Sequence, residues 1–332
     1  MAARRKTRKG GWLPALVTMV LLVLVAVYAG GGDLEAGLGE ILGTALPTET
    51  AAPSAPAASE APETRDPAQT AAPQAEGEGM TLTVLEVGKA DCLVLQCDGE
   101  SMIIDGGNEG DEAYILEHLE EMGISEFRYL VNTHPHEDHL GSLDAVVRAY
   151  PVAQAYLSPR EHTTKSYENL LTALEEENVP TEIPEPGDTF SLGGAEITVL
   201  SPDPDADYDN INDWSIVLLA QYGDVRYLLM GDAETPVESD LLESGIDLKA
   251  DVLKVGHHGS STSSKKAFLQ AVSPSYAVIT CDRTEEAGEP HAEVSERLAE
   301  LDISVLRTDL SGVLTLYTDG SGVSVTTERE AA

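Results

Sequence analysis

Basic residues are scarce in this sequence. Its 332 residues include 20 Lys and Arg against 58 Asp and Glu, a formal net charge of −38. A protein that holds nucleic acid through many phosphate contacts needs a basic groove, because those contacts are made by Lys and Arg. The composition therefore excludes a generic basic groove. A bound cation could still supply local positive charge, so a phosphate-containing substrate stays open.

Cysteine and long apolar runs are scarce as well. Cys92, Cys97 and Cys281 are too few and odd in number for a disulfide framework, so we expect buried or incidental thiols. Residues 13–29 form the one long, almost wholly apolar run. A chain with one such run does not by itself predict a membrane channel.

The N-terminus predicts a membrane-related segment over residues 1–32. Five basic residues within residues 1–9 precede the apolar run, and a spanning helix needs about 20 residues. Basic ends stay in the cytoplasm, which places the rest of the chain outside it. We favour a single-pass signal-anchor in the cell membrane with an extracellular domain, because the run is longer than a usual signal-peptide core. Cleavage near Ala29, giving a secreted protein, is the alternative.

Residues 33–79 have the composition of a linker. Ala, Pro, Thr, Glu and Gly dominate, with nine acidic residues against one basic. Such a segment cannot bury enough apolar surface to fold, so we predict a disordered tether. The folded domain is then expected over residues 80–328, in a C-terminal part that holds most of the negative charge.

Strand patterns open and close this domain, with helices between. Residues 80–88, 92–96 and 101–104 predict an antiparallel meander. Amphipathic helices are predicted at 111–122 and 166–177, on either side of a strand at 127–132. Further strands are predicted at 196–200, 215–221, 225–230, 251–255, 276–280, 304–306 and 313–317, with a helix at 292–301. Strands interleaved with helices predict an α+β fold of two sheets covered by helices.

The sharpest motif follows the strand at 127–132. Residues 133–139 read Thr-His-Pro-His-Glu-Asp-His. Imidazole and carboxylate together suit zinc, manganese or iron, and this spacing lets one turn serve two adjacent ions. A solvated polar loop would explain a single His, but four potential ligands at this spacing favour a metal site. The four are His134, His136, Asp138 and His139.

The motif resembles the His-x-His-x-Asp-His of the metallo-β-lactamase superfamily, and other segments extend the resemblance. Residues 103–107 (Ile-Ile-Asp-Gly-Gly), 231–234 (Gly-Asp-Ala-Glu) and 253–260 (Leu-Lys-Val-Gly-His-His-Gly-Ser) look like further motifs of that family. Together with residues 87–91 and 307–312, they resemble the hydrolase domain of ComEC-type DNA-uptake (competence) proteins and their free-standing relatives. The resemblance covers about residues 80–327 and implies a four-layer αββα sandwich.

It also implies a site for two divalent ions, Zn²⁺ or Mn²⁺. The implied metal ligands are His134, His136, Asp138, His139, Asp232 and His257. His134 and His136 would hold one ion, while Asp232 would contact both ions. For the other ion, His257 or His258 would join Asp138 and His139. We assign His257 as the ligand and His258 as a catalytic substrate contact, with Asp105 as a brace of the metal loop.

The sequence departs from the family pattern in two places. The first metal often has a third His between His139 and Asp232, but the one His there, His162, is expected far from the site. Residues 210–215 (Asn-Ile-Asn-Asp-Trp-Ser) stand in its place, and Asn212 or Asp213 could contact a metal, water or substrate, or form a plain turn.

The second departure is at residues 288–291 (Gly-Glu-Pro-His), where this branch often has Gly-His-Pro-His. The retained His291 is a candidate proton donor, or else a surface residue at a helix start. Ser260 is a further candidate for contacting the substrate.

These features predict an extracytoplasmic metal-dependent hydrolase. Bound metal lowers the pKa of water to about 7 and so supplies hydroxide at neutral pH. The resemblance suggests phosphodiesterase or nuclease activity, with extracellular DNA as one substrate. A cell-wall or small-molecule phosphoesterase, acting for example on phosphocholine esters, is the first alternative. A non-catalytic surface-binding protein is the second, and β-lactam hydrolysis fits the motifs less well.

Overall fold

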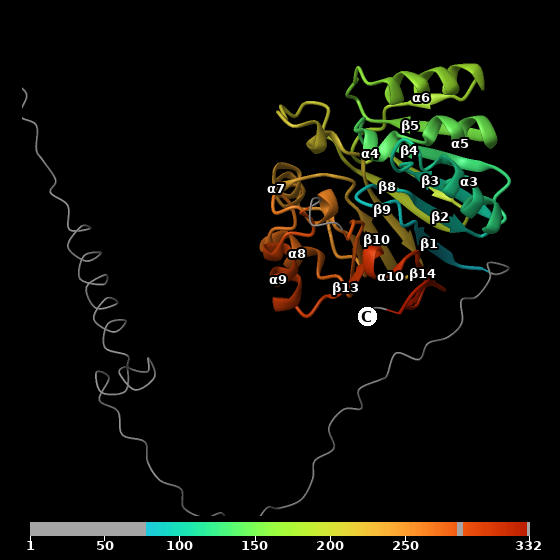
Figure 1. Cartoon of the computed structure of the whole chain (residues 1–332). Coiled ribbons are helices and arrows are strands. Elements are labelled where there is room, and N and C mark those ends of the chain that lie inside the picture. Colours follow the sequence, from blue (N-terminus) through green and yellow to red (C-terminus); the bar gives the residue numbers. More distant parts are fainter. Residues whose placement is uncertain (1–77, 284–287, 331–332) are drawn as a thin grey trace, which may run out of the picture. The chain divides into compact units, whose positions relative to one another are not determined.

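Two β-sheets stacked face to face form the centre of the molecule (Figure 1). The computed structural model describes residues 78–283 and 288–330. The first sheet has the order β15-β14-β1-β2-β3-β4-β5-β6, and the second has the order β13-β12-β11-β10-β9-β8-β7.

The first sheet contains β1 (Met80–Val84), β2 (Leu93–Cys97), β3 (Glu100–Ile104), β4 (Phe127–Asn132), β5 (Val152–Leu157), β6 (Thr181–Glu182), β14 (Leu314–Thr318) and β15 (Val323–Thr327). The second contains β7 (Thr189–Leu192), β8 (Ala195–Ser201), β9 (Val217–Tyr222), β10 (Val225–Leu229), β11 (Val252–Lys254), β12 (Tyr276–Ile279) and β13 (Ser304–Arg307). In each sheet the strands that lead to the site are parallel: β3, β4 and β5 in the first, and β10, β11 and β12 in the second.

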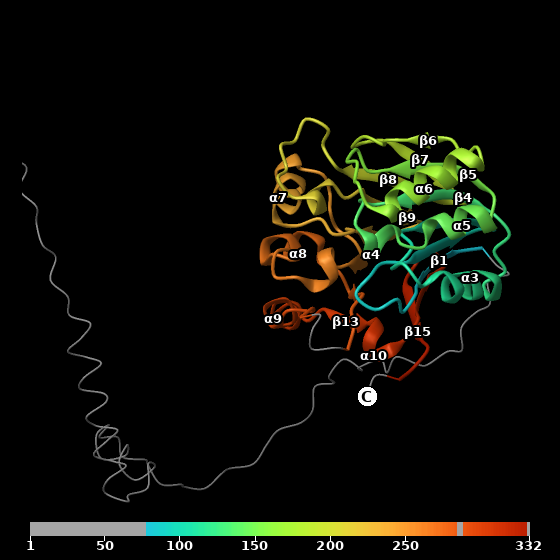
Figure 2. The ribbon, with the colours of Figure 1, turned by 45° about the horizontal axis from the view of Figure 1, so that its top comes forward.

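Helices cover the outer face of each sheet, as the two views show (Figures 1 and 2). The first sheet carries α3 (Glu112–Glu121), α5 (Leu143–Ala149) and α6 (Lys165–Glu176). The second carries α7 (Thr235–Ser244), α8 (Lys266–Val272) and α9 (Ala292–Glu300). Short helical turns are α4 (Glu137–Leu140), η1 (Ile211–Trp214), η2 (Gly256–Gly259) and α10 (Thr308–Ser311). The predicted four-layer sandwich is confirmed.

Alternation along single strands explains the layers. In β2, Leu93 and Leu95 face the core between the sheets, whereas Val94 faces the core beneath the helices. Successive side chains of a strand point to opposite faces, so a strand covered on both sides must be apolar throughout. Ala155 of β5 likewise packs in the core beneath the helices, whereas its neighbour Tyr156 packs against the core between the sheets. The apolar strand runs in the sequence are therefore typical of a sheet buried on both faces.

Several predicted boundaries and elements differ from the structure. The first strand ends at Val84 rather than Gly88, and the chain turns at Gly88, where φ is 74°. The sequence pattern also missed α7 and α8. In α7 only Val237 and Leu241 are buried apolar residues, a repeat too sparse to stand out. The strands predicted at 215–221 and 225–230 form the β9–β10 hairpin.

The predictions for residues 1–32 and for the linker up to residue 77 lie outside the described residues. Within residues 78–283 and 288–330, no helix is both long enough and apolar enough to cross a membrane.

Candidate metal centre

The predicted ligands meet at one edge of the sandwich, where parallel strands of both sheets end. Asp105 follows β3, the 133–139 loop follows β4, Asp232 follows β10, and His257 and His258 follow β11. In open α/β sheets, ligands bind beyond the carboxyl ends of the strands, where connecting loops converge. Backbone hydrogen bonds join the two sheets there, including Ile216 N–H to Thr133 O at 2.9 Å.

Asp105 holds the loop that carries most of the ligands. Its Oδ1 accepts hydrogen bonds from Thr133 N–H at 2.8 Å and Asn132 Nδ2 at 3.1 Å, and its Oδ2 lies 2.7 Å from His139 Nδ1. The side chain is fully buried. A partner on one ring nitrogen orients the other nitrogen of a ligand histidine. The structure thus places Asp105 where a brace of the metal loop would lie.

The first pair of ligands is His134 and His136. Nε2 of His134 lies 2.9 Å from Nδ1 of His136, and 3.9 Å from Oδ2 of Asp232. Two ring nitrogens and a carboxylate oxygen therefore face a common point. That arrangement suits a divalent metal that prefers nitrogen and oxygen ligands.

A second, tighter group consists of Asp138, His139, Asp232 and His258, with ligand atoms that all lie within 4.8 Å of one another. Nε2 of His139 is 3.3 Å from Asp232 Oδ2, and Nε2 of His258 is 3.5 Å from Asp232 Oδ1 and 3.6 Å from Asp138 Oδ2. Three of these buried atoms, His139 Nε2, His258 Nε2 and Asp232 Oδ1, have no hydrogen-bond partner. Buried polar atoms without partners are costly, and a bound cation would satisfy all three. The residues present fit a metal ion.

His258 joins this group, where we had assigned His257. Nε2 of His257 nevertheless lies 3.8 Å from Asp232 Oδ2. Both residues have left-handed backbone angles, with φ of 47° and 53°, so the turn sends their rings in different directions. The His258 side chain is fully buried in the site. Nδ1 of His257 instead lies 2.8 Å from Glu234 Oε1, and its side chain is 22% exposed. We therefore take His258 as the candidate ligand and His257 as the residue at the rim.

Three residues to which the sequence motifs assigned no role support His258. Nζ of Lys254 lies 2.8 Å from Oδ2 of Asp91, and both side chains are almost fully buried. Thr280 Oγ1 donates to Asp91 Oδ1 at 2.5 Å and lies 2.9 Å from Nδ1 of His258. The sequence signal was a lysine within an otherwise apolar strand, since a buried Lys almost always has a partner.

Burial and neighbouring charges shift the pKa values of Asp232, His139 and His134. Burial would raise the pKa of Asp232, but the neighbouring His139 and His258 hold it well below its ordinary value. For His139, burial alone would lower the pKa, whereas Asp232 and Asp105 raise it well above the ordinary value. Burial holds the pKa of His134 well below its ordinary value. Because metal ligands must be deprotonated, metal and protons compete for His139.

Asn212 and Asp213 lie beside this centre and contact Glu234, a residue to which the sequence motifs assigned no role. Its Oε1 accepts from Asn212 Nδ2 at 3.2 Å, and its backbone N–H donates to Asp213 Oδ1 at 3.0 Å. Burial raises the pKa of Asp213 to about 6. The Oδ1 atom of Asn212 is buried without a partner. These contacts give Asn212 and Asp213 a structural place beside the site.

Ser260 directly follows η2, and His291 contacts the same loop through Ser261. Ser260 Oγ accepts from Thr262 Oγ1 at 3.0 Å, and Nδ1 of His291 accepts from Ser261 N–H at 2.9 Å. His291 also precedes α9 as its N-cap residue. The structure brings both to the loop that follows His258.

His162 was expected far from the metal loop, and that expectation was wrong. Its ring centroid lies 6.1 Å from that of His136, in the connection between β5 and α6. The two residues are far apart in sequence, but β4 and β5 are parallel, so the loops that follow them begin at the same edge of the sheet.

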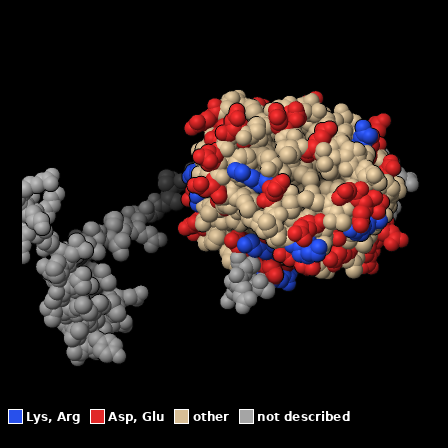
Figure 3. Space-filling view, turned by 90° about the horizontal axis from the view of Figure 1, so that it is seen from above, with Lys and Arg blue, Asp and Glu red and all other residues tan. Residues whose placement is uncertain are grey.

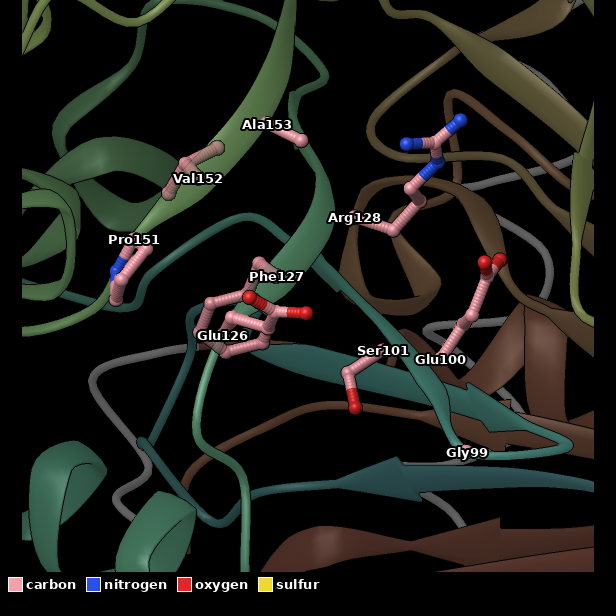
Figure 4. Close-up of a pocket in the computed structure, with 9 residues that line it drawn as sticks. All are labelled: Gly99, Glu100, Ser101, Glu126, Phe127, Arg128, Pro151, Val152 and Ala153. Carbon is pink, nitrogen blue, oxygen red and sulfur yellow. The ribbon is translucent and has the colours of Figure 1, made fainter.

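A hollow of about 380 Å³ lies away from this centre (Figure 4). Its lining includes Glu100, Phe127 and Val152, the first residues of β3, β4 and β5. These strands are parallel, so the hollow and the metal centre lie at opposite ends of them. Its lining contains no His or Cys, and we assign no chemistry to it.

On the face shown in Figure 3, acidic side chains are spread widely and basic ones are fewer and scattered. Residues 80–332 contain 49 acidic against 14 basic residues. Away from a bound cation, this surface repels polyanions.

The chain belongs to the metallo-beta-lactamase superfamily, whose sequence profile matches residues 85–281. ComE operon protein 3 of Bacillus subtilis (strain 168) is 32% identical over 203 residues, 61% of this chain and 26% of that protein. Competence protein ComA of Neisseria gonorrhoeae is 30% identical over 244 residues, 73% of this chain and 33% of that protein.

Recombination protein 2 of Haemophilus influenzae (strain ATCC 51907 / DSM 11121 / KW20 / Rd) is 30% identical over 234 residues, 69% of this chain and 27% of that protein. The chain thus spans about a quarter to a third of the length of these relatives. Among solved structures, a variant of CmlA beta-hydroxylase has a TM-score of 0.51 at 15% identity, covering 74% of this chain and 55% of that one, and so shares the fold. Fold, family and site together define a metal-dependent hydrolase of this superfamily, consistent with the ComEC-type relatives expected from the motifs.

Proposed function

We propose that this protein is an extracytoplasmic metal-dependent phosphodiesterase, with extracellular DNA as one substrate. The observation that carries the proposal is the group formed by Asp138, His139, Asp232 and His258, with three buried ligand atoms that lack partners. The names of two relatives, Competence protein ComA and Recombination protein 2, support a nucleic-acid substrate.

The side chains divide into two ligand sets. His134 and His136 would hold one ion, and Asp138, His139 and His258 the other, with Asp232 facing both. When bound, two divalent ions supply Lewis acidity and an activated water. Asp105 orients His139, and Thr280 with Asp91 orients His258, so each ring presents Nε2 to the centre.

The rim residues would contact the substrate. His257 is partly exposed and is held by Glu234, which raises its pKa although burial alone would lower it. A partly protonated imidazole beside the centre can donate a hydrogen bond to a phosphate oxygen. We propose the same kind of contact for Ser260 and His291, which lie on the adjoining loop.

The extracytoplasmic location is part of the proposal and rests on the sequence. The basic residues 4–9 followed by the apolar residues 13–29 support a membrane anchor with the domain outside, or a secreted protein after cleavage.

The acidic surface favours a second candidate. Polyanion affinity depends on many basic contacts, and the domain offers few of them. Short or single-ended phosphodiesters, and cell-wall or small-molecule phosphoesters such as phosphocholine esters, therefore fit better than long DNA held along a groove.

The test uses the full-length protein in detergent. Metal content is measured first, and hydrolysis is then assayed with Zn²⁺ and with Mn²⁺ on single-stranded DNA, double-stranded DNA, bis-p-nitrophenyl phosphate and a phosphocholine ester. We expect turnover that is lost with a chelator and in His136→Ala, but kept in His118→Ala, a histidine on α3 outside the site.

Cleavage of DNA and of the simple diester would support the first candidate, and cleavage of the phosphocholine ester alone would support the second. Turnover that is unchanged by the chelator or by His136→Ala would sink the metal mechanism. A metal-free protein without turnover would favour a non-catalytic binding role.

A further inference from the structure

His162 lies next to the first pair of ligands without an assigned role. Its ring is nearly perpendicular to that of His136, at 85°, with 6.1 Å between the centroids. Its Nδ1 atom is buried and has no hydrogen-bond partner. A buried ring nitrogen that lacks a partner and lies beside another imidazole needs a physical explanation.

The loop that carries His162, residues 158–164, is fixed at both ends. Ser158 Oγ donates to Trp214 O at 2.9 Å, and the guanidinium of Arg160 lies 3.7 Å from the Trp214 ring centroid. Thr164 is the N-cap of α6, where its side chain accepts from Tyr167 N–H. A cation stacked on Trp is a favourable contact. These contacts on both sides of His162 hold it beside His136.

The first ligand pair also lacks a third imidazole where the superfamily pattern would place one. Residues 210–215 contain none, and Ser215 Oγ lies 3.4 Å from His134 Nδ1, on the side of the ring away from His136. Zinc-type ions commonly take three or four protein ligands. His134, His136 and Asp232 supply three, and Asp232 is shared with the other ion.

We propose that His162 is a ligand of the first metal ion. Metal–nitrogen bonds of about 2.0–2.1 Å place two imidazoles on one ion with their centroids up to roughly 6 Å apart. The separation of 6.1 Å from His136 is at the upper end of this range.

This inference rests on the metal-binding part of the proposed function and not on the substrate. Full-length protein, stripped of metal, is titrated with Zn²⁺ against a chromophoric chelator, and with Co²⁺ by visible absorption. The wild type should bind two ions. In His162→Ala the affinity for one ion should fall by at least the ~10–100-fold that follows loss of a residue supporting a metal ligand. The affinity for the other ion should be unchanged.

The Co²⁺ spectrum of His162→Ala should also change as one nitrogen ligand is lost, and His162→Cys, which keeps a ligand atom, should recover tight binding of both ions. His118→Ala is the matched control, since this half-buried histidine lies on α3 with Nδ1 2.9 Å from Tyr114 O. It should bind both ions as the wild type does.

Two unchanged affinities in His162→Ala would overturn the proposal, and so would equal weakening of both ions. If the protein binds two ions and His162→Ala weakens only one of them, but no phosphodiester is cleaved, the role of His162 stands and the proposed substrate is wrong. A wild type that binds no ion would sink both.

Discussion

Nδ1 of His139 lies 2.7 Å from Oδ2 of Asp105, a residue 34 positions earlier in the chain. The contact turns Nε2 of the imidazole toward Asp232, 3.3 Å away. A residue of the β3 end thereby sets the direction of a ligand that follows β4.

The first prediction concerns Asp105→Asn. Asparagine tolerates the left-handed backbone of this position, where φ is 59°, so the loop keeps its path. The amide cannot stabilise a His139 N–H as a carboxylate does. We expect affinity for the ion at the Asp138–His258 group to fall about 10–100-fold, measured by calorimetric titration. Asp188→Asn, on an exposed loop, should leave it unchanged. Wild-type affinity in Asp105→Asn would contradict the role of the brace.

The second prediction concerns the buried pair of Lys254 and Asp91. Lys254→Met removes the cation and leaves the Asp91 carboxylate buried without its ionic partner. Breaking a buried ion pair typically costs about 3–5 kcal/mol of unfolding free energy. Asp91→Asn in the same chain should recover a large part of this loss, because no uncompensated charge remains. Urea unfolding of the metal-free proteins measures both, and strictly additive losses would refute the coupling.

The third prediction is a pH dependence set by Glu238. Burial raises the pKa of this carboxyl from 4.5 to about 7, although the backbone N–H groups of Ser264 and Lys265 donate to it. As pH rises from 4.5 toward 7, the unfolded carboxyl ionises while the folded one keeps its proton. Stability should therefore decrease across this window, by up to about 3 kcal/mol.

The measurement compares urea unfolding at several pH values in the presence of a chelator. Glu238→Gln should flatten the profile relative to the wild type, since the amide does not titrate. Glu243→Gln, an exposed residue of the same helix, serves as the control and should keep the wild-type slope. Parallel profiles for Glu238→Gln and the wild type would show that this carboxyl does not titrate in the window.

The fourth prediction tests the packing of the metal loop. A Cβ at Gly141 would lie 2.2 Å from the backbone of Asn108 and Glu109, so the backbone itself would have to move. Gly141→Ala should cost about 1–3 kcal/mol or more of unfolding free energy and weaken metal binding, because the displaced segment follows His139 directly. Gly322→Ala, at an exposed site with open space, should stay within about 0.5 kcal/mol. Equal stability of the two variants would contradict the close approach.

Local spacing made much of the centre predictable. His134, His136, Asp138 and His139 lie within one turn of chain, so their proximity needs no knowledge of distant contacts. Strands interleaved with helices predicted two sheets covered by helices, and the resemblance to the metallo-β-lactamase superfamily implied the four-layer order. α7 was missed because its apolar repeat has only two buried members, Val237 and Leu241.

The sequence by itself determined the class of this protein: an acidic α+β domain with a His-x-His-x-Asp-His loop at a strand end. Tertiary structure decided how the two adjacent histidines lie. Two successive left-handed residues bury His258 against Asp138 and Asp232, and they place His257 with Nδ1 beside Glu234 and Nε2 3.8 Å from Asp232. Tertiary structure also decided that Asp91 and Lys254, 163 positions apart by their numbers, form one buried pair, and that His162 lies beside His136. Such contacts arise because strands of two sheets end at a common edge. Local sequence does not show which distant residues meet there.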